Sequence, residues 1–405
     1  MEKFNYYKEL ITEYAKSNFE KLFREPDGLL KHKFIVPGSK YSSDLWDWDS
    51  WLTNIAMRKL GDNDKLFEYE KGCILNFLEN TTDEGQMPIC IKPESTLGGP
   101  LDPGNKNIHK PCLCQHALFI CEENNSFEWL KDGFSVMEKF ISYYYKNCLH
   151  ESGLFFWLDD GAIGVDNDPC TFYRPEKSSG SIYLNTLMYK ELISIATIAE
   201  KLGFSDKKEM YIKKAEELKN AIREHMWDER NGFYYSVDLN LYPVNPEDGR
   251  HSGCPRHWST LIQRIDVWTG FMPMWAGIAT KEEAKRIVEE NYKNERTFNS
   301  PYGVRSLSKL EKMYRVVKSG NPSCWLGPIW GIANYMVFEG LLNYGYIEEA
   351  KELGYKTVKL FGQDVEKSGQ FHEYYDGDTG EGVHNIGFQS WNLLVVNMIE
   401  KLENL

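Results

Sequence analysis

The chain contains no long apolar run and no strongly basic segment, and both absences exclude classes of protein. None of its 405 residues falls in a stretch near the roughly 20 apolar residues that a membrane-spanning helix needs. The first twenty residues, MEKFNYYKELITEYAKSNFE, are charged and amphipathic, unlike a secretory signal. The formal net charge is −13, without a cluster of lysine and arginine. We therefore expect neither a membrane nor a nucleic-acid partner.

Metal and redox motifs are also missing. The nine cysteines are odd in number, and Cys112 and Cys114 form CxC where a zinc or redox site has CxxC. The sequence lacks GxSxG, HExxH, Walker and dinucleotide-binding motifs, and His109, His116 and His257 lack ligand-like spacing. We expect reduced, buried thiols in a cytosolic protein, with no metal and no cofactor.

Aromatic residues are abundant, at 14% of the chain, with 12 tryptophans and 24 tyrosines. Aromatic rings stack on the flat C–H faces of sugars, so this content fits a carbohydrate ligand. The simpler interpretation is a large aromatic core.

Helical periodicity covers most of the chain, and fully apolar segments alternate with amphipathic ones. The stretch 181–203 is apolar nearly all round, whereas 206–227 has one apolar stripe and a charged remainder. Helices are expected near 2–24, 48–60, 64–80, 111–123, 126–147, 181–203, 206–227, 265–279, 281–291, 326–344, 346–362 and 387–403.

This alternation predicts an all-α fold, an (α/α)6 toroid of six inner and six outer helices, as one domain over 1–405. The alternatives are an irregular helical bundle and an open solenoid, although no fixed-period repeat is present. One short β excursion is expected at the turn Asn231-Gly232.

Unusual polar-aromatic motifs stand immediately before, or at the start of, each expected inner helix. They are LWDWDSW (45–51), NIHKP (107–111), IGVDNDPCTFYRP (163–175), HSGCPRHW with QRIDVW (251–268), SCWLGPIW (323–330) and FHEYYDGDTGEG (371–382). In an alternating toroid the starts of all inner helices meet at one end, where their free N–H groups face a ligand. The six motifs are therefore predicted to line one pocket.

Carboxylates and indoles dominate these motifs. Glycoside hydrolysis needs one carboxyl group to protonate the leaving oxygen and a second to attack or to activate water. Asp166 and Glu373 are the candidates, each beside apolar or aromatic neighbours that can raise a carboxyl pKa.

Each acid also has a structural interpretation. Asp47 or Asp49 could cap a helix, Asp166 could belong to a turn, and Asp376 to Gly380 could form an exposed turn or part of a calcium loop. Asp159 and Asp160 are the alternative acids.

In these residues and motifs the chain resembles the clan of inverting (α/α)6 glycosidases that includes trehalases and processing α-glucosidase I. It looks most like the bacterial members of glycoside hydrolase family 63, which also holds mannosylglycerate hydrolases. The resemblance runs from about Phe34 to Leu402. It implies inversion by a single displacement, no essential cofactor, Asp166 as general acid and Glu373 as general base. The two carboxyl groups would then lie roughly 6.5–9.5 Å apart.

The resemblance also implies a set of substrate-binding residues. The family's WDxD/S segment corresponds to Trp46, Asp47, Trp48 and Asp49, and its W-x-G-P-I-W…N-Y segment to Trp325, Gly327, Trp330 and Asn334. Lys110 and Gln115 approximate a further family segment. Arg174 and Trp391 complete the expected set.

Two departures bear on specificity. Relatives often carry Arg where this chain has Leu326, so one polar contact to substrate would be missing. Arg174 lies eight residues after Asp166, farther than the corresponding arginine of trehalases. A short α-glucoside other than trehalose is therefore the expected substrate.

Three rival functions remain open: a sugar epimerase or isomerase on the same toroid, a glycoside phosphorylase, and an inactive carbohydrate-binding protein. Epimerases use histidines, and phosphorylases need a basic phosphate-binding cluster. The expected partner is a small glycoside, and the sequence carries no signal for oligomeric state.

Overall fold

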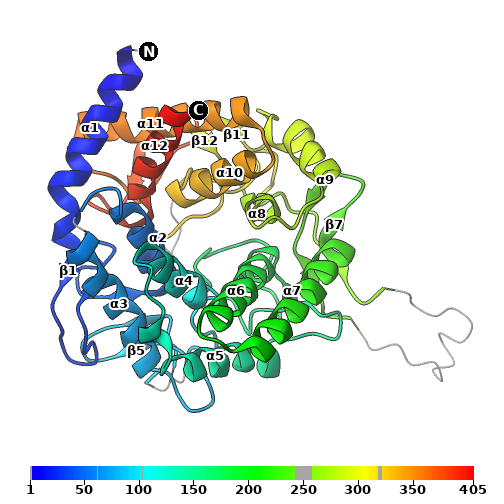
Figure 1. Cartoon of the computed structure of the whole chain (residues 1–405). Helices are drawn as coiled ribbons and strands as arrows, with labels where there is room; N and C mark the ends of the chain where they lie inside the picture. The colour runs from blue at the N-terminus through cyan, green and yellow to red at the C-terminus, as the bar shows by residue number, and fades with distance from the viewer. Residues whose placement is uncertain (1, 62, 100, 103, 242–257, 318–321) are drawn as a thin grey trace, which may run out of the picture.

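A computed structural model describes residues 2–61, 63–99, 101–102, 104–241, 258–317 and 322–405. Over these residues the chain forms an all-α (α/α)6 toroid with minor β excursions, as the alternation predicts (Figure 1). The outer ring consists of α1 (Glu2–Asn18), α3 (Asn63–Glu79), α5 (Phe134–Asn147), α7 (Ser205–Met226), α9 (Lys281–Arg286) and α11 (Ile347–Ser368). The inner ring consists of α2 (Asp47–Met57), α4 (Leu113–Glu123), α6 (Ile182–Lys201), α8 (Met272–Trp275), α10 (Gly331–Asn343) and α12 (Val395–Asn404).

Burial separates the two rings, as their sequences predict. Helix α6 is buried on nearly every face, including polar Asn185 and Glu191. Helix α7 buries one stripe, in which Tyr211, Ala215 and Leu218 lie, and leaves its charged face to solvent. The apolar stripe of an outer helix packs on an inner helix, which is itself enclosed by both rings.

Several boundaries differ from the expected ones. The segment expected as one helix over 265–279 is a 3-10 turn, η3 (Trp268–Phe271), followed by the one-turn helix α8. Gly270 packs against the Phe233 ring, Pro273 lacks an amide donor, and Gly277 has a φ of +71° that ends the helix.

Other helices begin or end in 3-10 turns, namely η1 (Phe19–Leu22), η2 (Glu128–Leu130) and η5 (Ser390–Leu394), and α9 continues as the π-helical turn η4 (Ile287–Tyr292). The expected capping box is present, with Thr280 accepting from the amide of Glu283.

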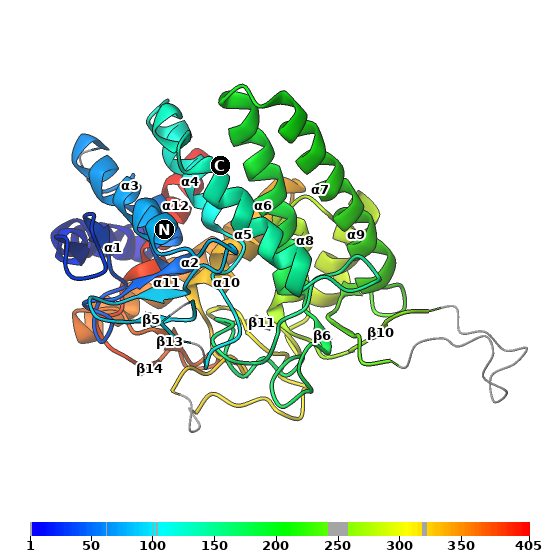
Figure 2. The same cartoon turned by 90° about the horizontal axis from the view of Figure 1, so that it is seen from below.

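Short antiparallel strands gather mostly on one side of the toroid (Figure 2). Strand β3 runs directly into α2, and β6 lies one residue ahead of α6, so the amino ends of these inner helices face that side. The strands are β1 (Phe23–Arg24), β2 (Phe34–Ile35), β3 (Leu45–Trp46), β4 (Cys90–Ile91), β5 (Thr96–Leu97), β6 (Ser179–Gly180), β7 (Trp227–Asp228), β8 (Phe233–Tyr234), β9 (Val237–Asp238), β10 (Leu261–Ile262), β11 (Asn299–Ser300), β12 (Gly303–Val304), β13 (Tyr374–Tyr375) and β14 (Gly382–His384).

The predicted turn at Asn231-Gly232 connects β7 and β8, and Gly232 has a φ of +59°. The described cysteines are all buried and unpaired. Among the described helices none combines the length and the apolar character needed to cross a membrane.

Candidate active site

A cavity of about 260 Å³ opens among the loops that lead into the inner helices. Its volume lies just below the range of about 300–1,000 Å³ typical of drug-sized ligands, which suits a small glycoside. The lining residues come from both halves of the chain: Pro37, Tyr41, Trp46, Trp48, Asp49, Leu97, Lys110, Ala162, Gly164, Asp166, Ser323, Trp325, Trp330, Glu373, Phe388 and Trp391.

The cavity unites most of the predicted residues. Asp166 and Glu373 both line it, together with Trp46, Trp48, Asp49, Lys110, Trp325, Trp330 and Trp391. Five of the six motifs thus converge in the described part of the chain. In the sixth, residues 251–257 lie outside the described residues, and Trp268 packs behind the cavity against Trp325, with ring centroids 6.0 Å apart.

Asp47 lies one layer behind the cavity and pairs with Lys110. The Lys110 ammonium donates to both carboxylate oxygens, at 2.9 and 3.0 Å, and the Lys110 backbone amide donates to Asp47 Oδ2 at 3.0 Å. The ammonium also lies 5.2 Å from the centre of the Trp48 ring. Asp47 therefore orients a lining lysine from behind.

Gln115 and Arg174 are not among the described residues that line the cavity, and their role in substrate binding stays a prediction. The Gln115 amide donates to the carbonyls of Pro111 and Leu187, at 2.7 and 3.1 Å, and so ties α4 to α6. Arg174 pairs with Asp238 at 2.7 Å. Each side chain thus contacts the protein through some of its polar atoms, and Gln115 Oε1 and Arg174 Nε are buried without a hydrogen-bond partner among the described residues.

Gly327 and Asn334 likewise support the fold. Gly327 has a φ of +141°, and an added Cβ would lie 2.5 Å from the Tyr314 ring. Asn334 accepts a hydrogen bond from the Val304 amide at 2.8 Å and donates to Thr357 Oγ1 at 3.0 Å. These residues shape the approach to α10 without lining the cavity.

Asp166 lies in a tight turn that is fastened to the opposite wall. The next residue, Asn167, has a left-handed φ of +52°. Its side chain donates to the carbonyl of Ser323 at 3.2 Å and accepts from the amide of Trp325 at 3.0 Å. The loop that carries Asp166 is thus held beside the tryptophan-rich wall.

Glu373 is supported through both its backbone and its side chain. Its amide donates to the carbonyl of His384 at 2.9 Å, and its Oε2 accepts from the Asn385 amide at 2.8 Å. The pKa of Glu373 is raised to about 7, chiefly by burial; the hydrogen bond from Asn385 opposes the rise, the charge of Asp166 adds to it, and Lys40 opposes it.

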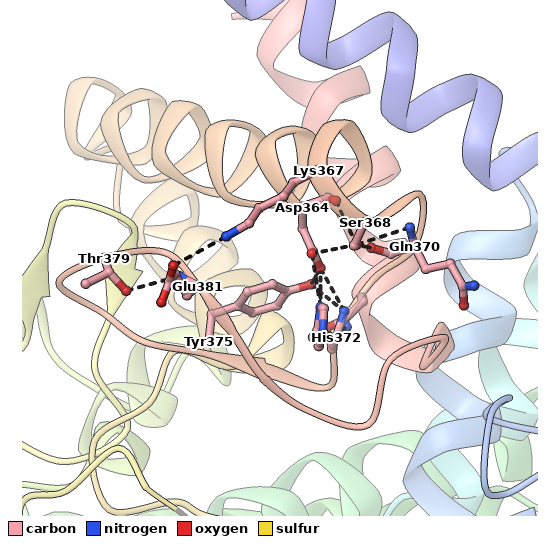
Figure 3. Close-up of polar contacts among 9 residues, drawn as sticks. Asp364, Lys367, Ser368, Gln370, His372, Tyr375, Thr379 and Glu381 are labelled. Atoms are coloured by element: carbon pink, nitrogen blue, oxygen red, sulfur yellow. Dashed lines mark hydrogen bonds and ion pairs between the residues drawn. The ribbon is translucent and has the colours of Figure 1, made fainter.

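Asp364 on α11 anchors the segment that carries Glu373 (Figure 3). It accepts hydrogen bonds from the His372 backbone amide and ring Nδ1, at 2.8 and 3.0 Å, from the Tyr375 hydroxyl at 2.8 Å and from Ser368 Oγ at 2.9 Å. Burial alone would raise the Asp364 pKa, but these donors bring it below its ordinary value.

Indole rings form a continuous wall. Trp325 and Trp330 stack with centroids 3.8 Å apart and planes within 2°, and Trp48 meets Trp391 edge-on at 5.2 Å. Such a wall offers a flat apolar surface beside the carboxyl groups, as sugar recognition needs.

Asp49 is the third carboxyl group of the lining. Ser390 Oγ donates to its Oδ1 at 2.8 Å. Burial raises the pKa of Asp49 to about 8, and the charges of Asp47 and Glu373 add to the rise, while Ser390 and Lys110 oppose it.

The alternative acids have local partners. Asp159 accepts from the Asn107 side chain at 2.8 Å, and Asp160 from the Tyr173 amide at 3.1 Å. Neither is among the residues that line the cavity.

The segment Asp376 to Gly380 forms a turn. The Asp376 carboxylate accepts from the amides of Asp378 and Thr379, and Asp378 pairs with Arg305 and Lys309. These carboxylates are occupied by the turn and by ion pairs.

His109 and His116 pack in the interior. Burial lowers the pKa of His109 to about 4 and that of His116 to about 3, and His116 lies 2.6 Å from the Asn54 amide. His257 falls outside the described residues.

Sequence reasoning missed the first lining segment, Pro37 to Tyr41, and the contacts of Asn385 and Ser390. Neither the segment 37–41 nor the segment 385–390 carries a charged-aromatic motif. The available signal is Tyr41 close behind Pro37-Gly38, and Asn385 close behind the FHEYY segment.

A closed helical toroid, with carboxyl groups and indoles converging on one cavity at the loop side, is the architecture of a glycoside hydrolase. The chain belongs to the mannosylglycerate hydrolase MGH1-like glycoside hydrolase family, whose model matches residues 41–391. The assignment to glycoside hydrolase family 63 and its trehalase relatives is thereby confirmed.

Two curated relatives illustrate the range of the family's neighbours. A probable mannosyl-oligosaccharide glucosidase from Schizosaccharomyces pombe is 26% identical over 308 residues, which cover 72% of this chain and 34% of the relative. A cytosolic neutral trehalase from Kluyveromyces lactis is 28% identical over 272 residues, 63% of this chain and 33% of the relative. The chain spans about a third of the length of these relatives.

Among solved structures, the family 63 mannosylglycerate hydrolase from Thermus thermophilus in complex with Tris and D-glycerate superposes with a TM-score of 0.72. The superposition covers 95% of this chain and 99% of the Thermus thermophilus chain, and the two sequences are 18% identical. The likeness establishes the shared toroid fold.

Proposed function

We propose that this chain hydrolyses a short α-linked glucoside, or a related α-glycoside, with inversion at the anomeric carbon. Asp166 protonates the leaving oxygen, and Glu373 removes a proton from the water that attacks from the opposite face. The observation that carries the proposal is that these carboxyl groups, about two hundred residues apart, line one small cavity with an indole wall.

The environment of Glu373 supports its role as base. With a pKa of about 7 it is close to the value at which a general base works best near neutral pH. The adjacent Asp166 is close enough to influence that pKa. We propose that their separation is roughly 6.5–9.5 Å, the range that leaves room for one water molecule.

The remaining lining residues supply binding. Asp49 and Lys110 offer polar contacts to hydroxyl groups, and Trp46, Trp48, Trp325, Trp330 and Trp391 cover the apolar ring faces. The relatives' names give the substrate classes to test first, namely α-glucosides, trehalose and mannosylglycerate.

A screen of α-linked disaccharides and glycosylglycerates, followed by NMR of the first anomer formed, tests the proposal. The β-anomer is expected to appear first, because one displacement inverts an α-linkage. A first-formed α-anomer contradicts inversion. A product altered at C2 without hydrolysis supports an epimerase, and turnover that requires phosphate supports a phosphorylase.

The lining favours hydrolysis over these rivals. Among the described lining residues there is no histidine to exchange a proton at C2, and the cation present, Lys110, is paired with Asp47. A carbohydrate-binding protein without activity would bind sugars from this screen and leave them intact. We also propose a cytosolic location, supported by the unpaired buried cysteines.

A further inference from the structure

The hairpin formed by β13 and β14 sets Asn385 opposite Glu373. Tyr374 pairs with His384 in this antiparallel hairpin, so Glu373, which precedes Tyr374, faces Asn385, which follows His384. The Asn385 side chain bridges this pair through Nδ2, which donates to Glu373 Oε2 at 2.8 Å. Glu373 and Asn385 are 5% and 8% exposed, so the contact is protected from water.

The Glu373 carboxylate determines which way the Asn385 side-chain amide points, and Ser39 contacts the other end of that amide. Ser39 Oγ donates toward Asn385 Oδ1 at 2.8 Å and lies equally close to the carbonyl of Ile386. A flipped amide would turn its oxygen toward the Glu373 carboxylate, which accepts hydrogen bonds only. The observed orientation satisfies both ends of the amide.

The turn that carries Ser39 is itself fastened to the loop after β14. The carbonyl of Pro37 accepts hydrogen bonds from the amides of Gln389 and Ser390, at 3.2 and 3.1 Å. Backbone hydrogen bonds therefore hold the Ser39 turn against the loop that follows Asn385.

Both supporting residues, Ser39 and Asn385, adopt a left-handed backbone conformation that residues other than glycine rarely adopt. Ser39 has a φ of +51° and Asn385 a φ of +50°. Asparagine enters this left-handed region more readily than most residues. Two such residues in one hydrogen-bonded chain, ending on a carboxylate of the cavity, indicate that the strain serves a function.

We propose that Asn385 is a positioning residue for the base: it holds Glu373 Oε2 so that Oε1 is left to accept the proton of the attacking water, and Ser39 holds the other end of the amide through Oδ1. This inference rests on the proposed function. It assigns Asn385 no contact with the substrate.

The same hydrogen bond acts on the charge of Glu373. A donor stabilises the ionised carboxylate and lowers its pKa, as the charge of Lys40 also does, against the rise caused by burial and by Asp166. Asp49 is the other carboxyl group of the cavity that interacts with Glu373. Loss of the donor raises that pKa. The acidic limb of the pH–rate profile, where a protonated base is inactive, then moves to higher pH.

Asn385→Gly provides the test, because glycine keeps the left-handed backbone while the donor is lost. We expect kcat to fall by about 10- to 100-fold, the effect of removing a hydrogen bond to a charged group. KM should change little, and the acidic limb should move upward. Asn385→Asp, which places a like charge beside Glu373, should lower kcat further.

Asn125→Gly is the matched control. Asn125 is an exposed asparagine with a φ of +46°, just beyond α4 at the end away from the cavity. Its kcat and pH profile should equal those of the parent enzyme. A merely conformational role for Asn385 predicts the same result for Asn385→Gly.

Parental kcat and an unmoved acidic limb in folded Asn385→Gly overturn the inference. If that variant does not fold by near-ultraviolet circular dichroism, Ser39→Gly decides: an unmoved limb overturns the inference, and an upward shift supports it. Failure of the proposed function is separate, because it appears as retained turnover in Glu373→Gln.

Discussion

Lys110 and Asp47 form a buried ion pair in which one ammonium group faces both oxygens of one carboxylate, at 2.9 and 3.0 Å. Their side chains are 2% and 0% exposed. Asp47 also accepts from the backbone amides of Trp48 and Lys110, so this carboxylate joins the motif before α2 to the motif before α4.

Replacing Lys110 by methionine should therefore destabilise the protein. The Asp47 charge would remain buried without its cation, which costs about 3–5 kcal/mol in comparable pairs. Urea unfolding at neutral pH measures the loss. Lys59→Met, which removes a surface ion pair with Glu400, should unfold like the parent. Equal stability of the two variants would contradict the structural role of the pair.

The pH dependence of turnover should follow Glu373. A base must be ionised, so kcat/KM should fall about tenfold per pH unit below an apparent pKa of about 7. Steady-state kinetics between pH 5 and 9 measures this limb. A limb at the ordinary glutamate value near pH 4.5 would show that burial does not control the base.

Substrates with different leaving groups separate the roles of the two acids. Asp166→Asn should abolish cleavage of an ordinary glycoside but retain cleavage of an α-glycosyl fluoride, because fluoride departs without a full proton transfer. Glu373→Gln should lose both activities, since water still needs its base. The reverse pattern would exchange the roles, and full activity in either variant would remove that residue from the mechanism. Circular dichroism confirms that each variant is folded.

Asp364 should be required to hold the segment around Glu373. Asp364→Asn turns an amide donor toward groups that are themselves donors, the Tyr375 hydroxyl and the His372 amide. We expect a loss of about 1–3 kcal/mol in the free energy of unfolding, with a lower kcat. Tyr375→Phe removes one of these hydrogen bonds and should cost about 0.5–1.5 kcal/mol. An Asp364→Asn variant as stable and active as the parent would rule out the anchor.

Stability should also depend on pH through Asp49. Its folded pKa of about 8 exceeds its value of 3.8 in an unfolded chain, so the folded state binds the proton more tightly. This contribution is complete below pH 3.8 and is lost as the pH rises toward 8. Between these limits one such group changes the free energy of unfolding by up to about 1.4 kcal/mol per pH unit. Asp49→Asn should flatten the fall in melting temperature from pH 5 to pH 8, and an unchanged slope would show that Asp49 is ionised throughout.

Local sequence patterns account for the helices and for the convergence of motifs. The contrast between α6 and α7 distinguishes inner from outer positions, because burial on all sides favours apolar residues while one exposed face favours charged ones. The motifs then meet because alternate helices point the same way. The assignment of all 405 residues to one domain stays a prediction, as do the roles of the individual site residues.

Long-range contacts account for what the sequence did not reveal. Asn334 stands in a segment that resembles a family pattern, yet its side-chain amide bonds to Val304 and Thr357. Asn385 carries no local signal, because its importance arises from a strand register and from Ser39, which precedes it by 346 residues. By contrast, the shortness of α8 follows from Pro273, which lacks an amide donor at its start, and from the left-handed Gly277 just beyond its end.

The ring is closed by elements from opposite ends of the numbering. Helix α1 packs on α11 and α12, and its Tyr14 ring meets Phe371 with centroids 4.6 Å apart, two residues from Glu373 (Figure 1). During synthesis on the ribosome, Trp46 and Asp49 emerge more than three hundred residues before Glu373 and Trp391. The apolar face of α1 therefore stays uncovered until α11 and α12 have been synthesised. A nascent chain that stops before that point exposes this apolar surface and lacks the cavity residues Glu373 and Trp391.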